Sequence, residues 1–320
     1  MKLLKMVPDH TNIDFMRWRN FALILSLIVT IISIVFTFYR GLNLGVDFVG
    51  GLMIEAKFQQ PPHLDQVRQK IDALHAGDAL LQQFGGKDTV SIRLPLPKST
   101  DEGASNQLIK QVTATLQQSY PGVTISRADT VSGKVSDELI LRGIGAVFAA
   151  VFGIALWGIF RFEWQFGVCT FVAVMHDVLM TLGFFALTRL EFDLNIVAAV
   201  LTIIGYSIND KIVIDDRIRE NLRKYRQMDI RTLIDLSVNE TLPRTIMTSL
   251  TILLALAALL LFGGHVLRGF TAAMMLGIVV GTYSSIYVSS SLLITLGLGR
   301  NRSDVRAEPQ KAERIGRPTP

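Results

Sequence analysis

Long runs of apolar residues dominate the chain from residue 21 onward. Six of these runs reach about 20 residues, which is long enough for a helix to cross about 30 Å of hydrocarbon. The pattern therefore predicts an α-helical polytopic membrane protein with six transmembrane helices. The predicted transmembrane segments are residues 21–39, 139–160, 164–187, 194–214, 243–263 and 270–298.

A polar stretch, residues 40–138, separates the first predicted helix from the other five, which lie within residues 139–298. Leu52, Ile54 and Phe58 alternate with Glu55 and Lys57, a pattern that predicts a strand with one buried face. Together with the elements that follow, this strand gives the order β-α-β-β-α-β, which predicts a ferredoxin-like α+β domain. The elements predicted after the first strand are a helix over 64–74, strands over 79–84 and 89–94, a helix over 108–116 and a strand over 123–128.

Basic residues set the predicted orientation in the membrane. They concentrate in residues 1–20, in a predicted loop at 215–242 and in the tail 299–320, which the positive-inside rule places in the cytoplasm with both termini. In residues 40–138 the acids slightly outnumber the bases, which places the α+β domain on the opposite side. The charged, proline-containing tail is predicted to be disordered. The cation clusters favour contact with anionic lipid over nucleic acid, which is not predicted to bind.

An ionisable residue inside hydrocarbon is costly and suggests a function by default. Asp210 lies within the fourth segment, four residues before its end. Burial favours a neutral acid and a nearby cation favours a carboxylate, so Asp210 is predicted to take up and release a proton as helices shift. Arg244 at the start of the fifth segment is the predicted partner, and Lys211 is a second candidate. The alternative is a carboxylate that reaches water, with Arg244 as a flanking charge and Lys211 directed outward.

His176 and Asp177 lie near the middle of the third segment. They could form a proton relay, because His titrates close to neutral pH, or a fixed hydrogen-bonded pair that orders the bundle. The second interpretation is slightly favoured. No nucleophile accompanies the pair, and Cys169 is the one cysteine, so neither catalytic residues nor a metal site are predicted. The chain is expected not to be an enzyme and to use no cofactor, with protons as the coupling ion.

Small residues recur at every fourth position of the sixth segment. Gly277, Gly281 and Ser285 share one helix face with this spacing. Small side chains let two helices approach closely in a membrane, so this face is predicted to pack against another helix.

Several stretches together resemble the SecF proteins of the SecD/SecF family, within the resistance-nodulation-division superfamily. Residues 45–51 (GVDFVGG) are similar to the signature turn of that family, and residues 205–221 (GYSINDKIVIDDRIREN) to its most specific motif. Residues 174–178 (VMHDV) and 241–245 (TLPRT) match further motifs in order. The residues that the resemblance assigns to the signature turn are Gly45, Asp47, Phe48, Gly50 and Gly51.

The resemblance implies a role in protein export. Proteins of this family pair with SecD beside the SecYEG channel, with YajC and YidC as further partners, in the bacterial inner membrane. They use the proton-motive force to help move unfolded preproteins into the periplasm, so the α+β domain would be periplasmic. The implied proton path contains Asp210 and Arg244, with Asn209, His176 and Asp177 as further members of the relay.

The chain departs from the family pattern beside the carboxylate. Lys211 stands where a small hydroxyl residue is usual, and Asp215 where the residue is usually uncharged. Two other functions remain open at this point. One is a proton-driven exporter of lipids or small amphiphiles with the same architecture, and the other is a passive scaffold of the translocon.

Overall fold

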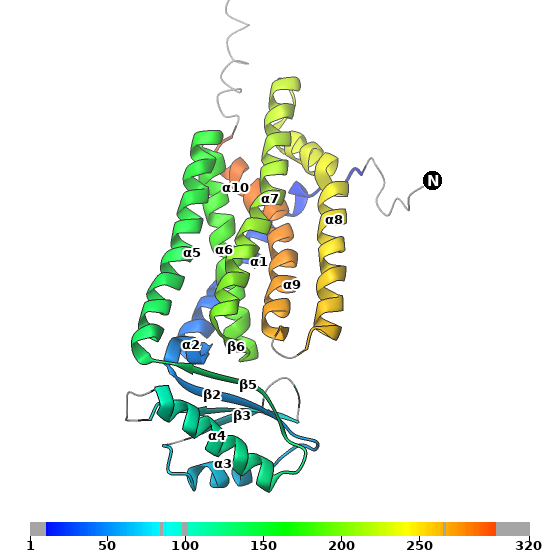
Figure 1. Cartoon of the computed structure of the whole chain (residues 1–320). Coiled ribbons are helices and arrows are strands. Elements are labelled where there is room, and N and C mark those ends of the chain that lie inside the picture. The colour runs from blue at the N-terminus through cyan, green and yellow to red at the C-terminus, as the bar shows by residue number, and fades with distance from the viewer. Residues whose placement is uncertain are drawn as a thin grey trace, which may run out of the picture.

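Six membrane-length helices stand side by side as a bundle, and a small α+β domain lies at one end of it (Figure 1). This computed structural model describes residues 11–77, 79–83, 86, 88–97, 102–264 and 267–298. The predicted fold class is confirmed. The tail 299–320, predicted to be disordered, lies outside the described residues.

The chain enters the bundle through the short helix η1 (Met16–Trp18). The sixth span is one run of helix that contains a π-helical stretch. The spanning helices are α1 (Arg19–Arg40), α5 (Gly133–Arg161), α6 (Trp164–Thr188), α7 (Leu194–Lys224), α8 (Ile230–Phe262) and the run α9 (Arg268–Tyr283), η2 (Ser284–Ser289) and α10 (Ser290–Thr295).

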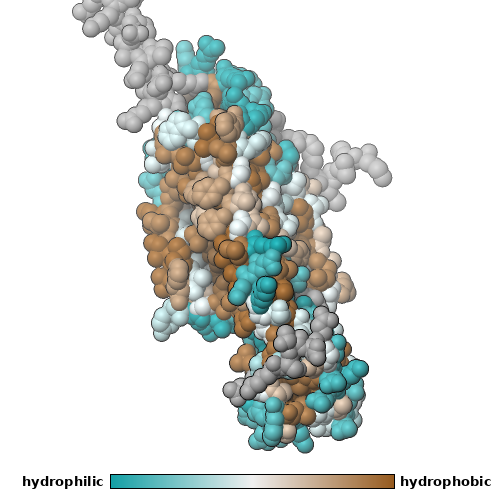
Figure 2. Space-filling view, turned by 60° about the vertical axis from the view of Figure 1, so that its left-hand side comes forward, coloured by the Kyte–Doolittle hydropathy of each residue, from teal (hydrophilic) through white to brown (hydrophobic). Residues whose placement is uncertain are grey.

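The helices α6, α7 and α9 form the interior of the bundle, whereas α1, α5 and α8 are much more exposed. Figure 2 shows a broad hydrophobic surface over the bundle and hydrophilic residues towards its far end and on the small domain. Large exposed side chains such as Phe36, Phe148 and Leu254 belong to this surface. An apolar exterior of this kind fits hydrocarbon, so the chain is a multi-pass membrane protein.

The connection between α7 and α8 is shorter than the predicted loop at 215–242. Helix α7 continues to Lys224 and α8 begins at Ile230, so only a short turn separates them. Ile218 of α7 packs with Leu233, Ile234 and Val238 of α8 in a buried apolar cluster. This packing stabilises helical turns that lie beyond the most hydrophobic part of each helix.

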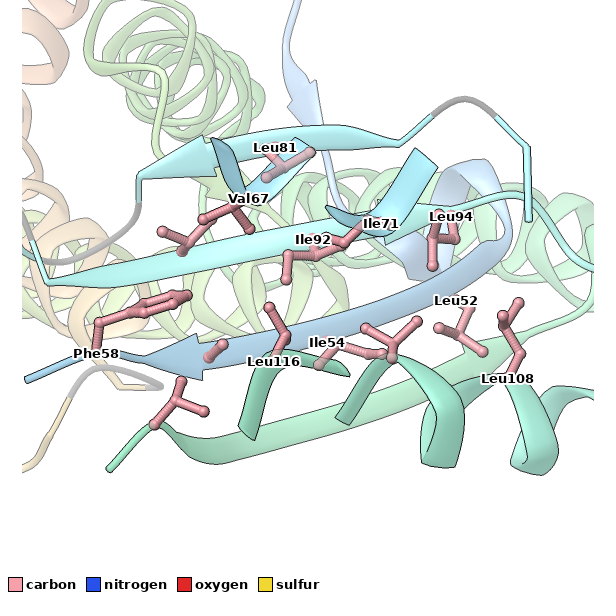
Figure 3. Close-up of a cluster of buried hydrophobic side chains, with 14 residues drawn as sticks. Leu52, Ile54, Phe58, Val67, Ile71, Leu81, Ile92, Leu94, Leu108 and Leu116 are labelled. Atoms are coloured by element: carbon pink, nitrogen blue, oxygen red, sulfur yellow. The ribbon is translucent and has the colours of Figure 1, made fainter. Parts of the chain in front are cut away.

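The small domain has the element order that the sequence predicts. Its antiparallel sheet has the strand order β3-β4-β2-β5, the ferredoxin-like arrangement. Both α3 and α4 cover the face of the sheet that points away from the bundle (Figure 1). The apolar core lies between these two helices and the sheet (Figure 3). The elements are β2 (Gly51–Lys57), α3 (Leu64–Asp72), β3 (Leu80–Gln83), β4 (Thr89–Leu94), α4 (Glu102–Ser119) and β5 (Thr124–Val131).

Strand β2 is buried on both faces, whereas the sequence predicted one buried face. Leu52 and Ile54 point into the core beneath α3 and α4. Met53 and Glu55, on the other face, are each 2% exposed. The second face is covered because the end of the bundle packs against it, a contact that alternation along one strand does not reveal.

Short elements join the domain to the bundle. Strand β1 (Asn43–Leu44) pairs in parallel with β6 (Glu191–Phe192), which lies between α6 and α7. The one-turn helix α2 (Val46–Val49) follows β1 and leads into β2. The β1–β6 pairing therefore connects the end of the first span to the segment between α6 and α7, at the end of the bundle where the domain lies.

Candidate functional site

A buried carboxylate at the midpoint of α6 organises the polar interior of the bundle. Asp177 is fully buried, and its Oδ2 accepts hydrogen bonds from the hydroxyls of Ser207 on α7 at 2.6 Å and Ser284 of η2 at 2.9 Å. Nδ1 of His176 lies 3.0 Å from its Oδ1. The carboxyl group thus joins three helices through hydrogen bonds of the kind expected for a pair that orders the bundle.

The π-helical stretch Ser284–Ser289 contributes several hydroxyl groups to this interior. Besides the Ser284 contact, Oγ of Ser285 donates to the backbone carbonyl of Ser207 at 3.3 Å. A π-helical turn changes the register of the side chains around a helix and is frequent at functional sites. Here serines of the sixth span contact both α6 and α7.

A second buried charge pair lies on α7, one turn beyond the Asp177 cluster. The side chain of Lys211 is 1% exposed, and its Nζ lies 3.3 Å from Oδ2 of Asp215. It also contacts the hydroxyl of Ser289. Lys211 therefore neither points outward nor pairs with Asp210, because the i,i+4 spacing on the helix brings it to Asp215 instead.

Asp210 is buried as well, at 2% exposure, and its Oδ2 has no hydrogen-bond partner among the described residues. The side chain does not reach the surface of the chain. Arg244 is exposed on α8, and its charge acts on Asp210 through space without a salt bridge between the two side chains. Asn209 is exposed and lies away from the buried cluster.

A line of hydroxyl groups connects three helices and begins at Tyr206, one turn before Asp210 on α7. The hydroxyls of Tyr206 on α7 and Ser249 on α8 are 2.9 Å apart, and Ser249 lies 2.9 Å from Oγ1 of Thr282 on α9. Hydroxyl groups both donate and accept, so such a line can pass a proton or hold the helices together.

The predicted small-residue face of α9 lies against α7. A Cβ atom at Gly277 would stand 2.4 Å from a side-chain carbon of Ile203, and one at Gly281 would stand 3.0 Å from Cβ of Ser207. Ser285 continues the same face with its bond to α7. Close contact of α9 with α7 brings the π-helical serines within reach of Asp177.

The signature turn lies at the boundary between the bundle and the domain. Gly50 and Gly51 have φ angles of +74° and +118°, a region that residues with a Cβ rarely adopt. At Gly45 a Cβ would stand 2.9 Å from Oε1 of Glu191. Glycine is therefore required by backbone conformation at two positions and by close approach at a third.

The other turn residues attach it to α7, α5 and β6. Oδ2 of Asp47 accepts a hydrogen bond of 2.9 Å from the backbone N–H of Leu194 at the start of α7. Its backbone carbonyl accepts one of 2.6 Å from Ser136 of α5. Phe48 is buried and packs against Phe192 of β6. The turn thus holds the domain to the ends of α5 and α7 and to β6.

The sequence did not predict the contacts of Ser284 with Asp177 and of Ser289 with Lys211, or the Lys211–Asp215 pair. The i,i+4 spacing of Lys211 and Asp215 was a signal that could have predicted the pair. The local sequence pattern does not predict the π-helical stretch that contains Ser284 and Ser289. Within the part of the chain that the structure describes, no group of three or more His, Cys, Asp and Glu residues could hold a metal ion.

These features define a polytopic membrane protein with a carboxylate-containing interior and one inserted ferredoxin-like domain. The family described as "Protein export membrane protein SecD/SecF, C-terminal" matches residues 111–299, and the "SecD/SecF GG Motif" matches residues 35–62. The chain belongs to the SecD/SecF family of protein export membrane proteins.

Two relatives named as SecF subunits agree with this family. The chain is 42% identical over 291 residues to the protein translocase subunit SecF of Rickettsia bellii, covering 91% of this chain and 95% of that protein. It is 40% identical over 311 residues to the SecF subunit of Rhodobacter capsulatus, covering 93% of each.

Solved structures of SecDF match the fold. The crystal structure of SecDF from Thermus thermophilus, a translocon-associated membrane protein, has a TM-score of 0.81 and 35% identity. The match covers 91% of this chain but 39% of that one. A SecDF structure in a super-membrane-facing form has a TM-score of 0.67 and 34% identity over 94% of this chain and 40% of that one.

Proposed function

We propose that this chain is the SecF-type subunit of a protein translocase and works with a SecD-type partner. The support is its similarity to SecF subunits over nearly their whole length, and to less than half of the solved SecDF chain. The match covers 39% of that chain, and its remaining length leaves room for a SecD-type half. By the same resemblance, the complex would stand beside the SecYEG channel, with YajC and YidC as further partners.

We further propose that the domain faces the periplasm and that the opposite end of the bundle faces the cytoplasm. Basic residues are concentrated at that opposite end, where Arg217, Arg219, Arg223 and Lys224 close α7. This distribution supports an orientation in the bacterial inner membrane with both termini in the cytoplasm.

The proposed activity is coupling of the proton-motive force to late steps of preprotein export. The observation that carries it is the Oδ2 of Asp210, which is buried in the bundle and has no hydrogen-bond partner in the part of the chain that the structure describes. A carboxyl oxygen in that position has an open site for a proton, whereas Asp177 is already engaged by its donors. Asp210 is therefore the proposed carrier, and Asp177 the fixed group that holds the helices around it.

Arg244 supplies the counter-charge in this mechanism. Arg244 is exposed on α8 and attracts the negative charge of Asp210 through space. Protonation of Asp210 would remove that charge and weaken the attraction between the two side chains. Helices α7 and α8 could then shift relative to each other. One proton crossing about 100 mV supplies about 2.3 kcal/mol, enough to bias two conformations that differ by a few kcal/mol. The activity is transport and involves no covalent catalysis.

The test uses inverted membrane vesicles that contain this chain, its SecD-type partner and the channel, with ATP saturating. Completion of preprotein export is compared with and without a proton gradient for wild type, Asp210→Asn and the control Asp216→Asn. Asp216 lies six residues along the same helix but is exposed. Loss of the gradient-dependent increment in Asp210→Asn alone supports the proposal. Survival of the increment in an assembled complex would make the chain a passive scaffold.

A further inference from the structure

A small polar cavity lies between the ferredoxin-like domain and the end of the bundle. Its volume is about 20 Å³, enough for one water molecule. The domain contributes Glu55 of β2 and Arg127 of β5 to its wall. The bundle contributes Glu191 of β6, together with Asp193 and Asn195 at the start of α7. The cavity therefore has carboxyl groups on both sides of the domain boundary.

Glu55 is the buried centre of this site. Glu55 is 2% exposed. Among the described residues, no side chain or backbone group forms a hydrogen bond or ion pair with its carboxyl group. Arg127 attracts its negative charge through space, whereas Glu191, Asp129 and Asp193 repel it. An ionised Glu55 thus stands in a small cavity where repelling charges outnumber the attracting one.

The other charged groups that line the cavity have ion-pair or hydrogen-bond partners, including Asp193, which accepts a hydrogen bond from the backbone N–H of Ile196. Arg93 of β4 holds Glu191 at 2.9 Å and donates to the carbonyl of Leu44 at 2.6 Å. Arg127 pairs with Asp129 on its own strand. Asp47 caps α7, and the start of α9 adds the uncharged Gly269 and Phe270 to the wall, preceded by Arg268. Among these groups, Glu55 is the one whose negative charge has no hydrogen-bond or ion-pair partner among the described residues.

We propose that Glu55 is the centre of a second proton-binding site, separate from Asp210, whose occupancy controls docking of the ferredoxin-like domain on the bundle. When Glu55 carries a proton, its repulsion with Glu191 and Asp193 disappears and the domain stays docked. When Glu55 is ionised, the repulsion acts across the boundary and favours separation. The site thus responds to the proton concentration on the side of the membrane where the domain lies.

The direction of the pH effect follows from the burial of these groups. Burial raises the pKa of Glu55 above its ordinary value, with Arg127 opposing the shift, and burial also raises the pKa of Glu191 and of Asp193. The docked state therefore binds these protons more tightly than a separated state in which water reaches the carboxyl groups. Docking is favoured at low pH and is lost as the pH rises through the raised pKa values.

The experiment measures the distance between the domain and the bundle in the full chain, reconstituted in lipid nanodiscs. Spin labels are attached to Gln107→Cys on α4 and Leu187→Cys on α6, both exposed positions, after replacement of the buried Cys169 by Ala. Distance distributions are recorded between about pH 4.5 and about pH 8, a range that covers carboxyl groups with raised pKa. The expected result is a loss of the docked population in wild type as the pH rises.

Glu55→Gln mimics the protonated side chain and is expected to keep the docked population at every pH. Asp193→Asn, which retains the capping role at the start of α7, is expected to weaken the pH response even if Glu55→Gln does not fold. Asp65→Asn removes an exposed carboxylate on α3 and should respond as wild type. A wild-type distribution that does not change with pH overturns the proposal, and so does a Glu55→Gln or Asp193→Asn response equal to that of Asp65→Asn.

The readout is a distance and requires neither a partner nor export. The docking proposal can therefore fail while Asp210 still couples export to the gradient. Conversely, loss of the Asp210 mechanism leaves the pH response of the domain intact.

Discussion

The hydroxyl of Ser207 on α7 donates a hydrogen bond of 2.6 Å to Oδ2 of Asp177 on α6. This contact joins two of the central helices at mid-bundle depth, and Ser284 adds the sixth span to the same oxygen. Ser207 is thereby fixed against α6. Asp210 lies one turn further along α7, and its buried Oδ2 has no hydrogen-bond partner among the described residues.

Asp177→Ala is expected to destabilise the bundle by about 1–2 kcal/mol. The substitution leaves the donors of Ser207 and Ser284 without their acceptor, and interhelical hydrogen bonds in membrane proteins contribute about 0.6 kcal/mol each on average. Thermal unfolding in detergent measures the change. Asp216→Ala, at an exposed position on α7, is the control and should unfold as wild type does.

Gly277→Ala is expected to reduce stability by about 1–3 kcal/mol, because overpacking forces neighbouring helices apart. The added Cβ would stand 2.4 Å from Ile203. Gly145→Ala on α5 is the matched control, since its Cβ would have no atom within 4 Å. Chemical unfolding of the two variants compares them directly. Equal stabilities would contradict the close approach of α9 to α7.

Lys211→Met is expected to cost about 3–5 kcal/mol, because it leaves the buried Asp215 carboxylate without its partner. The double variant Lys211→Met with Asp215→Leu should regain much of that loss, since no unpaired charge remains. Unfolding of wild type, both single variants and the double variant forms a complete cycle. Additive effects would show that the two side chains do not interact.

Arg93→Gln is expected to loosen the attachment of the domain to the bundle. It removes the ion pair with Glu191 and a charged hydrogen bond to Leu44, and such bonds contribute about 1.5–3 kcal/mol. Hydrogen exchange of the β1 and β6 amides should become faster. The comparison variant is Arg142→Gln, whose pair with Glu138 is exposed and should contribute little. Unchanged exchange in Arg93→Gln would argue against its role in docking.

The sequence alone determined the six spans and the β-α-β-β-α-β order. Both depend on periodicities within single elements, since about 20 apolar residues in a row require a membrane, and alternation along a strand requires a buried face. Motifs such as residues 45–51 and 205–221 indicated the resemblance to the SecD/SecF family. Asp210 could be chosen as a candidate because an acid within an apolar run is unusual wherever the helix packs.

Only the tertiary structure decided which of these residues meet. The burial of Glu55 depends on the bundle that covers the second face of β2, and the distance between Asp210 and Arg244 depends on how α7 and α8 are rotated. Lys211 lies inside because α7 turns it towards Ser289. Such contacts join residues far apart in the chain, and no local pattern fixes the rotation and register of one helix against another.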